Sequence, residues 1–159
     1  MAKDFTHLDG QGNPAMVNVG DKNESKRFAK ARSTVILDDR IMEFLKNEEI
    51  HTKKGPVFQT AIIAGIMAAK KTSDLIPLCH PIALENCKLT INVGDNNEVI
   101  INCEVSITSK TGVEMEALTG ASVAALTIYE MCKALSHEIV IKETRLIEKT
   151  GGKNDFRAR

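Results

Sequence analysis

Two long segments of this chain are apolar on most sides, and this feature limits the folds it can adopt. Residues 53–71 read KKGPVFQTAIIAGIMAAKK, and residues 113–135 read VEMEALTGASVAALTIYEMCKAL. Both are predicted helices, because Gly55 and Pro56 favour a helix start and two lysines close the first segment. A chain of 159 residues has too little sheet to cover such helices completely. We therefore expect part of their apolar surface to form a subunit interface.

Other segments alternate between apolar and polar residues, which is typical of half-buried strands. The alternation covers residues 27–37 and 138–149. Residues 87–94, 96–99 and 100–108 make two alternating runs around a polar turn, which predicts a hairpin. Residues 38–47 start with two aspartates and are predicted to form a short amphipathic helix. This order predicts a single α+β domain over residues 1–159, in which a mainly antiparallel sheet packs against helices. Residues 1–14 and 154–159 are expected to be flexible.

Composition argues against several classes of protein. The formal net charge is zero, which is unlike a protein that binds nucleic acid through a basic face. Four cysteines at positions 79, 87, 103 and 132 form no C-x-x-C pair, so neither a disulfide framework nor a zinc site is predicted. No apolar run approaches the length that spans a membrane, and we expect a cytoplasmic protein with reduced thiols and no membrane partner.

The second apolar helix carries charged residues that could act as an acid–base pair. Glu116 and Glu130 are fourteen residues apart, about four turns, which predicts nearly the same helix face. Lys133 follows Glu130 by three positions, so their side chains are neighbours. A solvated surface ion pair is one interpretation. The apolar neighbours equally favour a dry cleft, in which a lysine and a carboxylate change each other's proton affinity.

Two shorter motifs surround this helix in sequence. Glu114 and Glu116 flank Met115 in its first turn, where the helix dipole favours acids in any case. Thr111 and Gly112 just before them could expose backbone N–H groups to an anion or a polar heterocycle. The LCHP motif places His80 between two prolines, which suits either a structural histidine or a preorganised site.

Lysines lie beside all of these motifs, at positions 53, 54, 70, 71, 110, 133, 149 and 153. The adjacent lysines at 53–54 and 70–71 are ordinary when each pair is taken alone: such residues are solvated, or they interact favourably with the dipole at a helix C-terminus. Several of them converging on one pocket would suit a triphosphate. The TGG at residues 150–152 lacks the spacing of a P-loop, so that kind of nucleotide site is not predicted.

Taken together, DLIPLCHPI, KTGVEMEALTGASVAALTIYEMCKA and KTGG resemble the MoaC family of molybdenum cofactor biosynthesis, over about Met16 to Lys153. The resemblance implies a ferredoxin-like fold and a phosphorus–oxygen lyase, cyclic pyranopterin monophosphate synthase. Such enzymes convert 3′,8-cyclo-7,8-dihydro-GTP, made by a partner radical GTP cyclase, to cyclic pyranopterin monophosphate and pyrophosphate. It also implies a homohexamer, a trimer of dimers with sites between subunits. We expect no cofactor and no metal.

The same resemblance assigns residues to the site. It places the catalytic pair at Glu130 and Lys133. The substrate contacts that it implies are Leu78, Cys79, His80, Glu114, Met115, Glu116, Lys54, Lys70, Lys149 and Arg27.

Three departures from the family pattern affect this assignment. Glu130 stands where the family usually has Asp, which moves the carboxylate by one methylene. Asn18 also replaces an Asp, and the tail KTGGKND is shorter than usual. An alternative hypothesis is therefore a nucleotide-binding regulatory module with weakened catalysis, which would bind a GTP analogue without releasing pyrophosphate. Another is a structural oligomer, which would bind no nucleotide.

Overall fold

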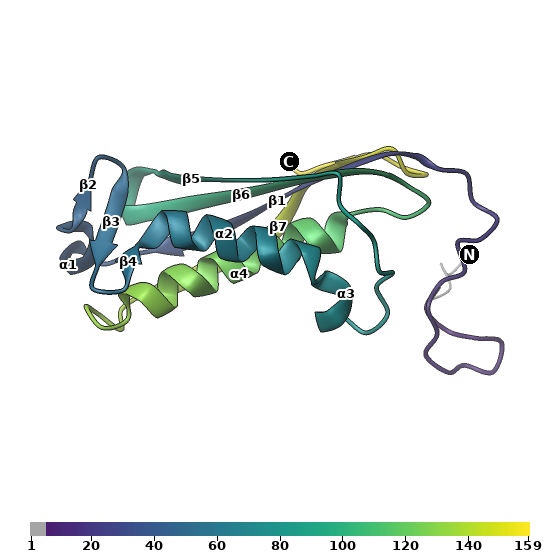
Figure 1. The fold of residues 1–159 in the computed structure, drawn as a ribbon, viewed down its shortest axis with the longest axis horizontal. Coiled ribbons are helices and arrows are strands. Elements are labelled where there is room, and N and C mark those ends of the chain that lie inside the picture. Colours follow the sequence, from purple (N-terminus) through teal and green to yellow (C-terminus); the bar gives the residue numbers. More distant parts are fainter. Residues whose placement is uncertain (1–5) are drawn as a thin grey trace.

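A five-stranded antiparallel sheet, covered on one face by two long helices, forms the body of the computed structural model, which describes residues 6–159 (Figure 1). All neighbouring strands pair antiparallel. This confirms the predicted α+β class, and the arrangement of the sheet is consistent with a ferredoxin-like fold. In spatial order the strands are β5 (Asn86–Val93), β6 (Glu98–Ser109), β1 (Ser25–Ile36), β7 (Val140–Thr150) and β8 (Phe156–Arg157).

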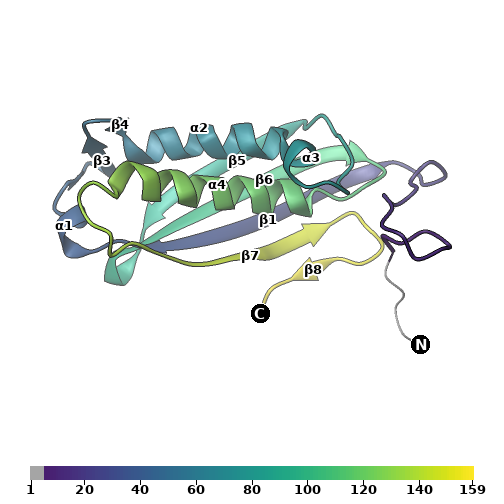
Figure 2. The same cartoon turned by 90° about the horizontal axis from the view of Figure 1, so that it is seen from below.

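The two long helices are α2 (Val57–Lys70) and α4 (Glu114–Cys132), which lie side by side along the sheet (Figure 2). They confirm the two helices predicted from the apolar segments. Both are built largely of small residues where they meet. A Cβ added at Gly65 would lie 2.8 Å from the carbonyl oxygen of Gly120, so the two backbones approach more closely than any larger residue allows.

The core lies between the helices and the inner face of the sheet. Ala29, Ala31 and Val35 of β1 are fully buried at alternate positions of the strand, as expected from the alternation in sequence. Ala121 and Ala124 of α4 are equally buried and pack into the same core. Small side chains on both elements therefore bring α4 close to the sheet and fix its position.

The prediction for residues 38–47 was wrong in its length. The helix α1 covers only Asp39–Met42, after Asp38 caps it. The chain then forms a small sheet of β2 (Leu45–Lys46), β3 (Glu49–Thr52) and β4 (Gly55–Pro56). Asn47 and Glu48 both have positive φ, 50° and 62°, which closes a two-residue hairpin turn between β2 and β3. A helix cannot continue through two such residues.

Parts of both terminal segments that were expected to be flexible form backbone pairs, and their flexibility stays a prediction. Residues 1–5, part of the segment expected to be flexible, lie outside the described residues. Leu8 forms an isolated bridge with Pro14, and Phe156 pairs with Lys149 of β7. Within residues 6–159, no helix combines the length and the apolar character needed to cross a membrane.

Large apolar side chains remain exposed on the outer faces of α2 and α4. Ile63 and Met67 of α2 are 60% and 54% exposed, and Leu126 of α4 is 57% exposed. Met115 and Lys133 lie 11 and 7 residues from Leu126, which are close to whole numbers of turns. These residues mark the outer stripe of α4, which is apolar at Met115 and Leu126 and charged at its C-terminal end.

Candidate functional site

A cavity of about 790 Å³ lies where the N-terminus of α4 meets the segment after α3 (Thr72–Leu75). The LCHP motif and the start of α4 are far apart in sequence, but both line this cavity. The structure thus brings together seven of the predicted site residues: Leu78, Cys79, His80, Glu114, Met115, Glu116 and Lys149.

His80 connects the cavity to the N-terminal segment of the chain. Its Nε2 lies 2.7 Å from the carbonyl oxygen of Val17, which can only accept a hydrogen bond, so Nε2 carries the proton. Val17, Val19 and Lys22 also line the cavity. The N-terminal segment is therefore one wall of the cavity.

Glu114 lies in the first turn of α4 and forms an ion pair with Lys149 of the sheet. Its Oε1 is 2.9 Å from Nζ of Lys149, and both side chains are about one-third exposed or less. The carboxylate folds back over Gly112, where an added Cβ would lie 2.0 Å from Oε2. Only glycine at position 112 leaves room for this arrangement. A cation and an anion thus stand at one edge of the cavity.

Glu116 is a buried carboxyl, only 4% exposed, and faces Cys79 and Glu114. Burial raises the pKa of Glu116, and the charge of Glu114 raises it further. Burial, followed by the charge of Glu116, raises the pKa of the Cys79 thiol. The cavity therefore contains a carboxyl that can take up a proton more readily than a solvated one.

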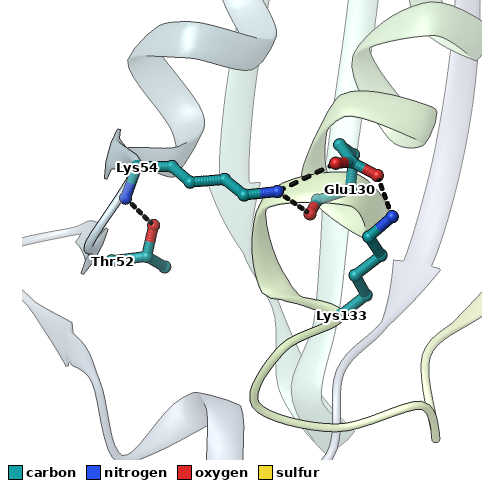
Figure 3. Close-up of polar contacts among 4 residues, drawn as sticks. All are labelled: Thr52, Lys54, Glu130 and Lys133. Carbon is teal, nitrogen blue, oxygen red and sulfur yellow. Dashed lines mark hydrogen bonds and ion pairs between the residues drawn. The ribbon is translucent and has the colours of Figure 1, made fainter.

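The second group of charges surrounds Glu130 at the C-terminal end of α4 (Figure 3). Its Oε1 is 2.8 Å from Nζ of Lys54, and its Oε2 is 2.6 Å from Nζ of Lys133. Lys54 also donates to the backbone carbonyl of Glu130, at 3.2 Å. Hydrogen bonds from Lys133 and then Lys54 lower the pKa of Glu130 to about 2. Glu130 is thus an anion held between two cations.

The expectation of a dry cleft around this pair is wrong for the single chain. The side chains of Lys54, Glu130 and Lys133 are 50%, 55% and 44% exposed. Glu130 and Lys133 lie at the C-terminal end of α4, near exposed Leu126, and Lys54 reaches them from the turn between β3 and β4. If this cluster becomes dry, another molecule must cover it.

The two groups of charges lie at opposite ends of α4. The fourteen residues between Glu116 and Glu130 correspond to about 21 Å of helix and to a rotation of about 40° from a common face. Glu116 is buried, whereas the Glu130 side chain is exposed, so the two carboxylates have different surroundings although their faces differ little in direction. Within one chain, His80 and Glu116 do not share a site with Lys133.

Comparison with known proteins identifies the chain. The model of the MoaC family matches residues 16–152. The chain belongs to the MoaC family.

Curated relatives of this MoaC chain fall into two kinds by length. A molybdenum cofactor biosynthesis bifunctional protein of Synechocystis sp. is 55% identical over 95% of this chain, which spans 45% of that protein. Molybdenum cofactor biosynthesis protein 1 of Dictyostelium discoideum is 49% identical over 95% of this chain, which spans 27% of it. A cyclic pyranopterin monophosphate synthase of Xanthomonas axonopodis pv. citri is 48% identical, with 97% of this chain and 93% of the relative covered. The chain therefore spans less than half of the first two relatives and nearly all of the third.

Two residues predicted for the site of this MoaC chain lie away from both groups. Arg27 holds the turn before α4, where its Nε and Nη2 donate to the carbonyls of Ser109 and Lys110 at 3.3 and 3.4 Å. Lys70 lines a separate hollow with residues 82–87. Their contact with a substrate stays a prediction.

The sequence reasoning missed the part played by the N-terminal segment in this MoaC chain. Residues 6–22 contribute to the cavity, and Lys110 ties the segment down by donating to the carbonyl of Gly20 at 2.7 Å. The alternation of Val17 and Val19 in MVNVG was a local signal of an ordered, extended segment. Its contact with His80 joins residues 63 positions apart, which no local pattern indicates.

Proposed function

We propose that this chain is a cyclic pyranopterin monophosphate synthase, which converts 3′,8-cyclo-7,8-dihydro-GTP to cyclic pyranopterin monophosphate and releases pyrophosphate. The observation that carries the proposal is the ion cluster around Glu130, found in a chain of the MoaC family. Relatives of matching length that bear this enzyme name support it. None of the relatives named above is called a regulatory module.

In the proposed mechanism, Glu130 and Lys133 move protons while the purine-derived ring opens and closes into the pterin. A lysine and a carboxylate in contact suit this role, because one can donate as the other accepts. An oxygen of the ribose-derived part then attacks the α-phosphorus, and the bond from that phosphorus to the β-phosphate oxygen breaks. Lysines of the cavity, Lys149 among them, would neutralise the triphosphate and the leaving pyrophosphate.

We further propose that one complete site needs two chains. The cavity and the Glu130 cluster are separated by about 21 Å on the same helix. The apolar stripe with Leu126 lies between them and is exposed. If a second copy covers this stripe, its cavity can face the Glu130 cluster of the first copy and exclude water from it. We propose a homohexamer built as a trimer of dimers, working in the cytoplasm downstream of the radical GTP cyclase.

The decisive experiment incubates the purified chain with the cyclised GTP derivative and measures pterin product and pyrophosphate. Lys133→Ala should abolish product, because Glu130 then loses its nearest proton partner. Lys142→Ala is the matched control: it removes a similarly exposed lysine from a 2.8 Å ion pair with Glu98, and it should leave turnover unchanged.

Two outcomes contradict the proposal. Near-normal turnover in Lys133→Ala rejects the assignment of the acid–base pair. Tight binding of a GTP analogue without pyrophosphate release, in the unmodified chain, favours the regulatory module instead.

A further inference from the structure

The lysine that completes the ion cluster comes from a hairpin, not from α4. Residues 49–56 form the β3–β4 hairpin, and Lys54 stands in its turn (Figure 3). The turn is closed locally, since the backbone N–H of Lys54 donates to Oγ1 of Thr52 at 3.1 Å. The Lys54 side chain is half exposed, and among residues 6–159 its Nζ forms hydrogen bonds with Glu130 alone. Its position therefore depends on where the hairpin sits.

Glu49, at the start of β3, attaches this hairpin to helix α2. Its Oε1 accepts hydrogen bonds from the backbone N–H of Ile50 and of Phe58, both at 2.8 Å. Its Oε2 accepts from the backbone N–H of Gln59 at 3.0 Å. Three charge-assisted bonds to one carboxylate leave it little freedom to rotate.

Within the described part of the chain, no other side chain caps the start of α2. The helix begins at Val57, and its N-cap residue, Pro56, makes no side-chain hydrogen bond. The N–H groups of Phe58 and Gln59 belong to the first turn, where they have no partner within the helix. Glu49 satisfies both and adds a negative charge where the helix dipole favours it. One carboxylate thus caps the helix and fixes the base of the hairpin at the same time.

We propose that Glu49 is a positioning residue, which holds the β3–β4 hairpin against α2 so that Lys54 reaches Glu130. Glu49 touches no substrate in this proposal and acts through Lys54. Its effect on turnover rests on the proposed function, whereas its effect on the contact between Lys54 and Glu130 does not. Two kinds of measurement can therefore separate a failure of this inference from a failure of the proposed function.

The first measurement needs no activity. Glu49→Gln keeps one acceptor oxygen but removes the charge and the second acceptor. The ¹³C signal of the Glu130 carboxyl is followed by NMR as the pH is lowered from neutrality, in the unmodified chain, in Glu49→Gln and in Lys54→Met. Lys54 and Lys133 are the cations that face Glu130. Loss of the Lys54 contact should make Glu130 begin to titrate at a higher pH, and Glu49→Gln should produce at least half of the shift seen in Lys54→Met.

The second measurement uses turnover in a double-mutant cycle. Glu49→Gln should lower kcat/KM about tenfold or more in the unmodified background, since a misplacement of about 1 Å costs on the order of a hundredfold. It should change kcat/KM less than twofold in the Lys54→Met background, because the residue it positions is already gone.

Ser33→Ala is the control for the titration. It removes a buried hydroxyl that bonds to Thr144 at 2.6 Å within the sheet, so it should lower the unfolding temperature without moving the titration of Glu130.

The inference is overturned if Glu49→Gln is folded by circular dichroism but leaves the titration of Glu130 unchanged. It is also overturned if the loss of kcat/KM is equal in both backgrounds, because Glu49 then acts independently of Lys54. Absence of pterin product from the unmodified chain rejects the proposed function alone, and the titration still decides the role of Glu49.

Discussion

Helix α4 carries a group of charges at each end, and its close crossing with α2 holds it in place. The contribution of this crossing to stability can be measured by substitution. At Gly65 an added Cβ would meet Cδ2 of Leu89 at 2.4 Å and the carbonyl oxygen of Gly120 at 2.8 Å. The leucine can move, but a backbone oxygen in a packed helix cannot move alone. Gly65→Ala should therefore push α2 and α4 apart and lower stability.

The size of the effect follows from two opposing contributions. Overpacking a well-packed core typically costs about 1–3 kcal/mol. Replacing glycine by alanine in a helix returns about 1 kcal/mol through helix propensity. Because the clash includes backbone, we expect the upper part of the overpacking range. The net loss in free energy of unfolding should be about 1–2 kcal/mol.

Urea unfolding followed by circular dichroism measures this loss, as a lower midpoint with an unchanged m value. Gly94→Ala is the matched control: its added Cβ would find nothing closer than 3.7 Å, and its φ of −98° is open to any residue. It should be neutral or slightly stabilising. If Gly65→Ala is as stable as the unmodified chain, the close crossing does not constrain the helices as argued here.

Two further predictions concern the cavity and the apolar stripe. Burial raises the pKa of Glu116, so its stabilising contribution is fully present below the ordinary glutamate pKa and is lost as the pH rises through the raised value. Glu116→Gln cannot ionise, so its unfolding temperature relative to the unmodified chain should rise as the pH increases above the ordinary glutamate pKa of about 4. A difference that does not change with pH would contradict this. Leu126→Glu places a charge on the exposed stripe of α4. Sedimentation should then show smaller assemblies, and turnover should be lost. Unchanged assembly would argue against this stripe as an interface.

Periodicity in the sequence was sufficient to predict the large elements of the fold. The strands β1 and β6 and the helices α2 and α4 are long enough for their buried faces to repeat several times. The strand β7 was predicted from its alternation alone, since none of its residues is fully buried. The small sheet β2–β4 was missed because its strands have two to four residues. Such strands show no repeat, and the positive φ of Glu48 is not a conformation that its residue type favours.

The sequence also indicated which residues belong to each half of the site, but not where the halves lie. Local motifs such as LCHP and EME identify the residues of the cavity. The separation of Glu116 from Glu130 follows from helix geometry alone, about 1.5 Å for each of fourteen residues. The spacing of Glu116 and Glu130, close to four whole turns, predicted a shared face. Their separation along the helix axis nevertheless places them at different ends of α4. The capping of α2 by Glu49 depends on a contact across a hairpin, which sequence spacing does not specify.

The Glu130 carboxylate joins a lysine at the end of α4 to a lysine of the β3–β4 hairpin. Lys54 and Lys133 come from different elements, so the fold, not residue 130, sets the separation of their backbone positions. Glu130 bridges them with both oxygens, at 2.8 and 2.6 Å. Aspartate, which is shorter by one methylene, could keep both bonds if the lysine side chains extended further or if the hairpin moved toward α4. The three hydrogen bonds of Glu49 oppose the movement of the hairpin. The length of the carboxylate arm at position 130 and the anchoring of the hairpin by Glu49 are therefore physically coupled.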